Sequence, residues 1–241
     1  MMGQDFSRRS TQAELADDLT LEGDASIKNM RELEGVNFWL GGKRTLISAL
    51  NKTYQKHWRS FENSKIVIAD LGCGGGDLLR DIHNWAEKKE LNVDLTGVDA
   101  SPFGVQSAIK KSQGFNNIQF KTLNVLSDEF KTMRFDIVCL NSFCHHLSDS
   151  NLIALLKQLE KQTSIAIIIN DLHRHWFAYL SISCISRLLN FSYLSLHDGP
   201  LSVLRAFQKH ELVNLLKSAD LNRYQIRWRW AFRWETLIWI K

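Results

Sequence analysis

The sequence contains only two prolines, Pro102 and Pro200, among its 241 residues. A proline-rich linker is therefore excluded, and neither a low-complexity segment nor an internal repeat divides the chain. With 44% hydrophobic and 23% charged residues, the chain is long enough and apolar enough to bury a full core. We expect one domain over residues 61–241, preceded by a helical extension over residues 1–60.

Cysteine is scarce as well. The four cysteines show no paired spacing, which excludes a disulfide framework and predicts free thiols in a reducing cytoplasm. The N-terminal residues lack the apolar core of a secretory signal, so none is expected. The best candidate for a membrane span, residues 176–194, contains Arg187 and several serines, and it falls short of the ~20 mostly apolar residues required. We therefore expect a cytoplasmic protein without a transmembrane helix.

A strong excess of charge of either sign is missing, since the formal net charge is only +4. Residues 1–35 hold eight acidic and four basic residues, which leaves 26 basic and 18 acidic residues in the remainder. This excess of eight positive charges favours anionic ligands without requiring nucleic acid.

From residue 65 onward, apolar runs alternate with amphipathic segments of helical periodicity. Such alternation predicts right-handed crossovers and a parallel sheet covered on both faces. The strand candidates are residues 65–70, 93–99, 117–123, 135–140 and 164–170, and the helix candidates between them are residues 76–90, 102–112 and 149–162.

The two ends of the chain differ from this alternation. Helical periodicity precedes it at residues 24–40 and 43–60, with two glycines between. After residue 171 we expect a helix to about residue 189, a loop containing residues 197–202, and a helix at 208–220. Two strands at 223–230 and 232–240 then follow closely, which predicts an antiparallel hairpin at the edge of the sheet.

Four glycines fall between residues 72 and 76, directly after the first strand candidate. A glycine-rich turn between a strand and a helix lets the backbone approach a ligand closely and places a helix N-terminus beside it. Asp70, Gly72, Gly74 and Gly76 form the pattern D-x-G-x-G-x-G, which resembles motif I of the class I S-adenosylmethionine-dependent methyltransferases. The resemblance implies that Asp70 organises the loop around the methionine ammonium and that the glycines, with Cys73 between them, admit the amino-acid end of the cofactor. A nicotinamide site would more usually show G-x-G-x-x-G.

The next strand tips continue the resemblance. Asp99 ends the second strand, where it matches the acid that accepts the ribose hydroxyls, and Ala100 follows where the adenine lies. The alternative for Asp99 is a turn or helix-cap role. Asn124, followed by Val125, stands where the family often has an aspartate for the adenine amino group, and its side-chain oxygen can still accept that hydrogen bond.

Asn141 and Ser142 at the tip of the fourth strand complete the series, as motif IV of the family. The resemblance covers residues 66–241. It implies an α/β, Rossmann-like fold with a seven-stranded, mostly parallel sheet, helices on both faces and an antiparallel terminal strand. It also implies S-adenosylmethionine as the cofactor.

The segments "CHHLSD" and "NDLHRHWFAY" are similar to the small-molecule methyltransferases of ubiquinone and menaquinone biosynthesis. A later "SVLRAF" adds a similarity to enzymes associated with type III polyketide synthases. We therefore expect O-methylation of a small aromatic or polyketide-derived hydroxyl compound. Carbon methylation of a phenol or quinol ring is the alternative, and the sequence makes no prediction of oligomeric state.

A phenolic acceptor must lose its proton, because such a hydroxyl has a pKa of about 10. His146, His173 and Asp171 lie at or beyond strand tips on the expected cofactor side and are the candidate catalytic residues. His146 has the alternative of packing against the next helix, and Asp171 that of a helix N-cap. No second cluster has the spacing of metal ligands, so we expect no metal site.

Residues 172–204 form a helical insertion that is longer than a typical connection. It can act as a lid that forms an apolar acceptor pocket with the N-terminal helices, or it can simply complete the core. Arg174 within it can hold an acceptor carboxylate or pair with Asp171.

Two other classes of function remain open. A nucleic-acid methyltransferase is not expected, because Asn141 is followed by Ser142 and Phe143 and not by the Pro-Pro-aromatic run of amino-group DNA methyltransferases. The segment "RWRWAFRW" interleaves cations and aromatics as single-strand binders do, although alternation in an edge strand explains it more simply. A non-catalytic cofactor-binding protein is the third class, and the intact Asp70, glycines and Asp99 argue against it.

Overall fold

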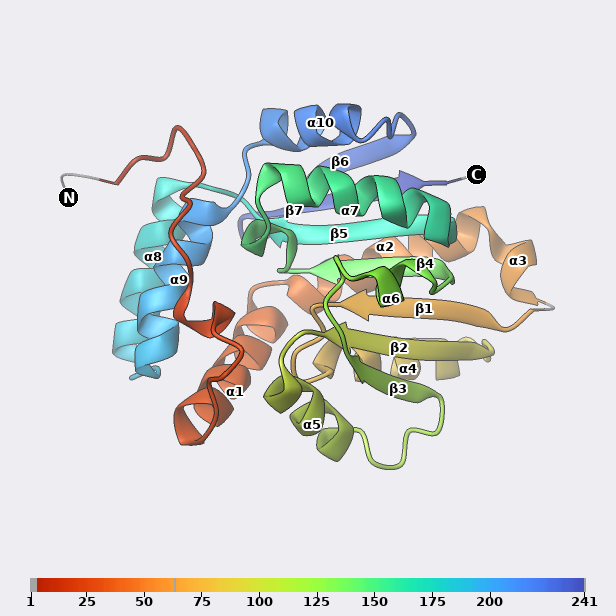
Figure 1. Cartoon of the computed structure of the whole chain (residues 1–241), viewed down its shortest axis with the longest axis horizontal. Coiled ribbons are helices and arrows are strands. Elements are labelled where there is room, and N and C mark those ends of the chain that lie inside the picture. The colour runs from red at the N-terminus through yellow and green to blue at the C-terminus, as the bar shows by residue number, and fades with distance from the viewer. Residues whose placement is uncertain (1–3, 63, 241) are drawn as a thin grey trace.

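The computed structural model describes residues 4–62 and 64–240, so the outermost residues of the two expected regions, 1–3 and 241, lie outside the described residues. Seven strands form one sheet in the order β3-β2-β1-β4-β5-β7-β6 (Figure 1). The strands are β1 (Ile66–Leu71), β2 (Val93–Asp99), β3 (Ile118–Thr122), β4 (Phe135–Asn141), β5 (Thr163–Leu172), β6 (Tyr224–Arg229) and β7 (Arg233–Trp239).

Strands β1 to β5 are parallel, and β7 is antiparallel to both of its neighbours, β5 and β6. The predicted fold class, a Rossmann-like and mostly parallel sheet with an antiparallel terminal strand, is confirmed. The register places Asp70 of β1 opposite Gly97 of β2 and Cys139 of β4. The carboxyl ends of these strands therefore meet at one edge, where open α/β sheets bind ligands.

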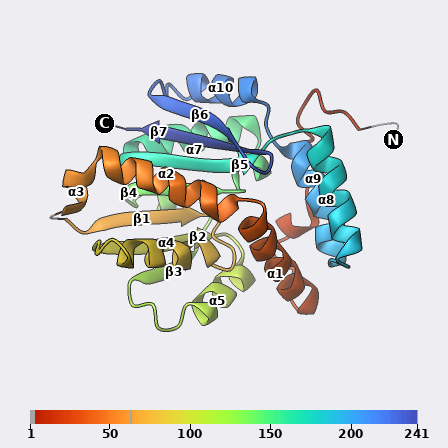
Figure 2. The ribbon, with the colours of Figure 1, turned by 180° about the vertical axis from the view of Figure 1, so that it is seen from behind.

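Helices cover both faces of the sheet. On one face, α7 (Asp149–Gln162) and α10 (Lys209–Ser218) bury leucines against β4, β5 and β7 (Figure 1). On the other, α2 (Gly42–Lys56) and α4 (Asp77–Glu87) do the same against β1, β2 and β4 (Figure 2). The remaining helices at the sheet are α3 (Trp58–Glu62), α5 (Pro102–Lys111) and α6 (Asp128–Lys131).

The helix α2 belongs to the expected extension, yet Leu46, Ala49 and Leu50 are completely buried in the same core cluster as Ile68 of β1. Burying these side chains in the shared core stabilises α2 on the sheet far more than helix propensity could. The division at residue 60 stays a prediction.

A helical cap lies beyond the carboxyl edge of the sheet. It consists of α1 (Asp24–Trp39), α8 (Trp176–Leu188) and α9 (Tyr193–Arg205), with α9 packed on both α8 and α1 (Figure 1). The segment before α1, which contains the short 3-10 helix η1 (Leu15–Asp17), lies along α9. No helix within the described residues is both long and apolar enough to cross a membrane, as expected.

The expected loop at residues 197–202 is wrong, because these residues lie in the middle of α9. Pro200 inside a helix removes one backbone hydrogen bond and costs about 3 kcal/mol. Tertiary packing offsets this cost, since Leu194, Leu201 and Leu204 of α9 are buried. Ser192 also caps the helix by accepting a hydrogen bond from the Ser195 backbone.

Candidate active site

A cavity of about 640 Å³ lies between the carboxyl edge of the sheet and the helical cap. Its floor consists of the ends of β1, β2 and β4 with the loops that follow them, and its roof consists of α1, α8, α9 and the segment around η1. The site lies between β1 and β4, where the strand order reverses direction, which is where parallel sheets open a crevice.

The glycine-rich turn after β1 forms one wall of the cavity. Gly74 donates its N–H to Asp99 Oδ2 at 2.8 Å, has a φ of +47°, and presents bare backbone with nothing within 4 Å of a notional Cβ. A Cβ on Gly72 would lie 2.3 Å from the Phe143 ring, so only glycine fits there. Cys73 between them is buried and lines the cavity, and burial raises the pKa of its thiol. Gly76 does not line the cavity, because it serves as the N-cap of α4.

The same wall is acidic. Asp70 is only 2% exposed, and its Oδ1 has no hydrogen-bond partner in the described part of the chain. Burial, together with the charges of Asp77 and Asp99, raises the pKa of Asp70 well above its usual value. A positively charged group of a ligand would relieve this repulsion and give Oδ1 its missing partner. The wall therefore fits a cationic ligand end placed against bare backbone, as the ammonium and sulfonium groups of S-adenosylmethionine require.

The loops after β2 and β3 continue this wall, and Asp99, Ala100, Asn124 and Val125 all line the cavity. Asp99 accepts hydrogen bonds from Gly74 and, at 2.8 Å, from the Ser101 backbone. Each carboxylate oxygen keeps a second lone pair for a ligand hydroxyl. Asn124 is exposed, and its Oδ1 already accepts a hydrogen bond of 2.9 Å from Leu126.

At the tip of β4, Asn141 and Ser142 line the cavity, and their role in binding the cofactor stays a prediction. The side chain of Asn170 donates to Asn141 Oδ1 at 2.6 Å, and the Ser142 N–H donates to the Asn170 carbonyl at 2.8 Å. Ser142 has a φ of +51°, which is uncommon for a residue with a side chain. The strand tip is thus held in one conformation by its neighbour β5.

Two histidine–carboxylate pairs stand side by side after β4. His145 Nδ1 lies 2.7 Å from Asp171 Oδ1, and His146 Nδ1 lies 2.7 Å from Asp17 Oδ1. The two rings lie with their centroids 4.3 Å apart and their planes tilted by 34°. Because a carboxylate accepts the Nδ1–H, Nε2 is the nitrogen of each ring that is left to exchange a proton.

Asp171 does not line the cavity and is fully buried against His145. Burial raises the pKa of Asp171, but the charge of His145 and its hydrogen bond outweigh it and keep this pKa below its usual value. Burial likewise raises the pKa of Asp17, and His146 outweighs it, so that the pKa of Asp17 is about 2. Both acids therefore stay ionised and orient their histidines.

His173 also lines the cavity, but it has no such partner. Its Nδ1 is buried without a hydrogen bond to any described residue, and burial, with the charge of His175, lowers the pKa of His173. His173 is therefore a neutral imidazole at neutral pH, without a carboxylate to fix its tautomer.

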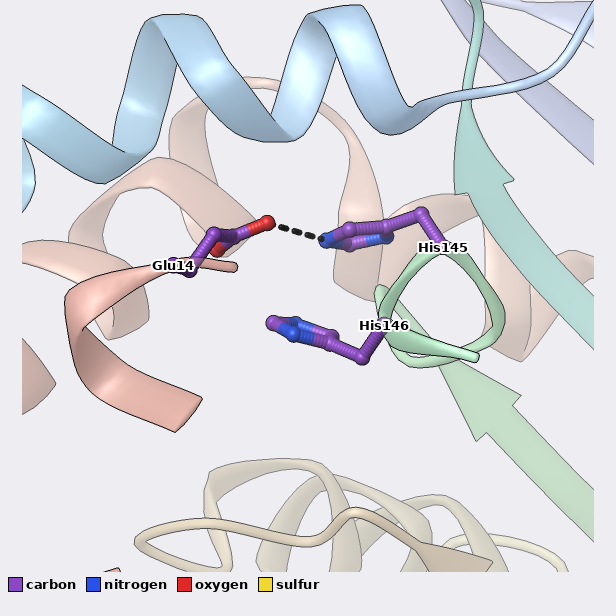
Figure 3. A group of neighbouring side chains, drawn as sticks. All are labelled: Glu14, His145 and His146. Carbon is purple, nitrogen blue, oxygen red and sulfur yellow. Dashed lines mark ion pairs between the residues drawn. The ribbon is translucent and has the colours of Figure 1, made fainter. Parts of the chain in front are cut away.

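Glu14 brings a third group toward the two histidines, and the three side chains point toward one another from the N-terminal segment and the turn after β4 (Figure 3). One ligand atom from each lies within 4.8 Å of the others, and Glu14 Oε1 is 3.7 Å from His145 Nε2. Two imidazoles and a carboxylate can hold zinc. However, the Arg205 guanidinium lies 3.6 Å from the same Glu14 oxygen and competes with a metal cation for it. The expected absence of a metal stays a prediction.

Sequence reasoning missed Glu14, Asp17 and Arg233, which the fold brings to the cavity from the two ends of the chain. No local motif marks them. It also misjudged Arg174, which is fully buried and pairs with Glu211 at 2.7 Å. Arg174 does not line the cavity and does not pair with Asp171, so both roles considered for it are wrong.

Comparisons with known proteins agree with this geometry. A stretch of 69 residues is 32% identical to carboxy-S-adenosyl-L-methionine synthase of Helicobacter pylori strain HPAG1; it covers 29% of this chain, and the chain spans only 28% of that relative's length. The fold is similar to that of the plantazolicin methyltransferase BpumL, with a TM-score of 0.64, 18% identity, and 90% and 91% of the two chains covered.

Two further solved structures share the fold. Human N-acetylserotonin methyltransferase has a TM-score of 0.62 and 17% identity over 89% of this chain and 55% of its own. The CurJ carbon methyltransferase has a TM-score of 0.58 and 11% identity over 77% and 51%. A sequence model described as a methyltransferase domain matches residues 62–197, more than half of the 241 residues, and the chain therefore belongs to this methyltransferase domain family.

Proposed function

We propose that this protein transfers the methyl group of S-adenosylmethionine to the hydroxyl of a small aromatic or polyketide-derived acceptor. One observation carries the proposal: the same cavity joins an acidic, glycine-lined wall to a pair of histidines that are each hydrogen-bonded to a carboxylate. The acidic wall suits the cofactor, and the pair of histidines suits the removal of a proton from the acceptor.

The proposed cofactor seat follows the wall of strand tips. Asp70 would take the ammonium group, Asp99 would accept the ribose hydroxyls, and the bare backbone at Gly74 would leave room for the amino-acid end. Gly76 contributes by shaping the turn and not by contact. The seat comprises Asp70, Gly72, Cys73, Gly74, Asp99, Ala100, Asn124, Val125, Asn141 and Ser142.

When bound, the cofactor supplies a methyl group that its sulfonium already makes electrophilic. The protein then has two tasks, to align the acceptor and to take its proton. We assign the second task to His146, because Asp17 holds its Nδ1–H and no described residue hydrogen-bonds its Nε2. Asp171 becomes a positioning residue for His145, and His173 remains a second candidate base on the same cavity.

The acceptor region supports a small, largely apolar molecule. Phe177, Ile182, Ile185 and Leu194 of the helical cap, with Phe191 between α8 and α9, line the same cavity as the histidines. The cap closes the carboxyl edge of the sheet, which argues against a nucleic-acid acceptor. Carbon methylation remains the alternative, since the same base can remove a ring proton.

The test is a panel of phenols, quinols and fatty acids incubated with the purified chain and S-adenosylmethionine, with mass detection of products. We expect a phenolic methyl ether together with S-adenosylhomocysteine. Methylation of total RNA or DNA without any small-molecule product contradicts the acceptor class. Tight binding of NAD without any binding of S-adenosylmethionine contradicts the reaction itself.

A further inference from the structure

The start of β7 places a buried cation in the wall of the cavity. Arg233 is 1% exposed, lines the cavity, and lies beside the end of β5, where it pairs in register with Leu172. Its Nε donates to the Leu40 carbonyl at 3.1 Å, and its terminal nitrogens donate to Ser142 Oγ at 2.9 Å and Asn37 Oδ1 at 3.3 Å. All three acceptors are neutral.

No carboxylate of the described residues lies within ion-pair distance of Arg233, which sets it apart from the other buried arginines. Arg174 pairs with Glu211 at 2.7 Å, and Arg205 pairs with Asp17 at 2.9 Å. An unpaired buried charge is costly, so proteins pair such charges or use them to bind a ligand. Burial accordingly lowers the pKa of Arg233 to about 10, which still leaves it charged at neutral pH.

Asp171 is the acid whose charge acts on Arg233, but it is not available as a partner. Its Oδ1 accepts from His145 Nδ1 and the Leu172 N–H, and its Oδ2 accepts from the His145 N–H. No described residue therefore supplies the missing counter-ion, and a ligand bound in the cavity would supply it.

The guanidinium keeps the means to bind such an anion. It has five N–H groups and uses three of them here, one on each nitrogen. One N–H therefore remains free on each of the two terminal nitrogens. A bidentate carboxylate accepts two such N–H groups.

We propose that Arg233 binds the carboxylate of a ligand in this cavity, either that of a hydroxylated acid as acceptor or that of the cofactor's amino-acid end. This rests on the proposed function, which supplies the cavity with its ligands. A carboxylate can reach this cavity from two sources, the acceptor or the amino-acid end of the cofactor, and the experiment separates them.

The experiment compares wild type with Arg233→Met, which keeps an unbranched stem but removes the guanidinium, and with Arg233→Lys, which keeps the charge. The control is Arg227→Met, because Arg227 is an exposed arginine of the same hairpin that does not line the cavity. Thermal unfolding first verifies that each variant is folded. Calorimetry then measures two carboxylate probes and their uncharged counterparts, S-adenosylhomocysteine against methylthioadenosine, and para-hydroxybenzoate against para-hydroxybenzamide.

We expect Arg233→Met to weaken one carboxylate probe by about 10- to 100-fold, leave its uncharged counterpart unchanged, and spare both in the Arg227→Met control. Loss confined to the hydroxybenzoate assigns the acceptor as the source, and loss confined to S-adenosylhomocysteine assigns the cofactor. Arg233→Lys keeps the charge but not the two-pronged donor geometry, so it should retain only part of the affinity.

The inference is overturned if wild type and Arg233→Met have equal affinities for both carboxylate probes. The same holds if neither protein binds the hydroxybenzoate and their affinities for S-adenosylhomocysteine are equal. That result leaves the proposed function intact as long as wild type binds S-adenosylhomocysteine. A wild-type protein that binds neither S-adenosylhomocysteine nor methylthioadenosine instead removes the proposed function.

Discussion

His146 combines the three properties that a general base needs at the scale of one residue. It lines the cavity, Asp17 fixes its tautomer, and no described residue occupies its Nε2. We expect His146→Ala to lower turnover by ~100-fold or more while the affinity for S-adenosylhomocysteine stays nearly the same. The measurement is single-turnover methylation of the best phenol of the panel, alongside calorimetry.

The matched control for His146 is His210→Ala, which removes an exposed histidine from α10. It should leave the rate unchanged. A wild-type rate in His146→Ala, with a large loss in His173→Ala, would transfer the role to His173, and wild-type rates in both would leave alignment alone to explain catalysis.

Asp17 should also make the stability of the fold depend on pH. Its pKa is about 2 in the folded protein, against 3.8 for a free side chain. Because the folded value is the lower one, the stabilisation is complete above about pH 5 and is lost as the pH falls toward 2. The shift corresponds to at most about 2 kcal/mol, and partial exposure of the side chain reduces this to about 1 kcal/mol.

Urea unfolding of wild type and Asp17→Asn at a series of pH values measures this effect. The difference in unfolding free energy between the two proteins should be largest near neutral pH and should shrink in acid. Asp94→Asn provides the comparison, since its carboxylate pairs with Lys65 at the surface. A difference that is constant with pH would contradict the depressed pKa of Asp17.

The cluster of Glu14, His145 and His146 makes a sharp prediction about metals. Arg205 already supplies a positive charge 3.6 Å from Glu14 Oε1, and Asp171 already holds His145. We therefore expect EDTA to leave methyl transfer unchanged and metal analysis to find no bound equivalent. One equivalent of zinc that is retained by wild type and lost in His145→Ala would refute this expectation.

At the scale of elements, the short segment around η1 is held by several side chains of α9, namely Asp198, Ser202 and Arg205. Asp198 accepts the N–H groups of Leu15 at 2.8 Å and Ala16 at 2.9 Å, and this contact places Glu14 and Asp17 over the cavity. Charge-assisted hydrogen bonds of this kind are worth about 1.5 to 3 kcal/mol each. Asp198→Ala should therefore free the segment locally without unfolding the sheet.

Hydrogen exchange measures this effect directly. Amides of residues 14–17 should exchange at least ~10-fold faster in Asp198→Ala, while those of β1 and β4 stay protected. Asp128→Ala, which removes an exposed acid from α6, is the control. Unchanged protection at residues 14–17 would show that other contacts hold the segment.

The elements differ in how far the sequence predicts them. Strands β1, β4 and β5 follow from long apolar runs, because strands buried on both faces are largely apolar. The edge strand β3 instead alternates apolar and polar residues and is largely exposed. The glycine-rich turn follows from backbone geometry that only glycine tolerates, as at Gly72. The loop expected at residues 197–202 fails, because its proline and glycine are local signals that the packing of α9 overrides.

At the scale of the whole molecule, the parts of the site that follow from local sequence patterns were predictable, and the parts assembled from distant segments were not. The cofactor wall could be predicted because each of its residues stands at a strand tip, and parallel topology brings those tips together. Glu14 and Arg233 could not, because they come from opposite ends of the chain. Both residues reach the same cavity because β7 lies between β5 and β6 and because the N-terminal segment packs on α9. Neither of these contacts has a local signature in the sequence.

This assembly from distant segments predicts that the cofactor stabilises the entire fold. Its proposed seat is contributed by the ends of β1, β2, β3 and β4, so it exists only when the sheet is complete. A ligand that binds only the folded state at 100 times its dissociation constant stabilises it by about 2.7 kcal/mol. For a chain of 241 residues this corresponds to a rise of roughly 5 to 10 °C in the unfolding midpoint.

Differential scanning calorimetry with S-adenosylhomocysteine should show this rise in wild type and a much smaller one in Asp99→Ala, which loses the proposed ribose contacts. A rise with NAD in place of S-adenosylhomocysteine would mean that the glycine-lined wall binds a different ligand.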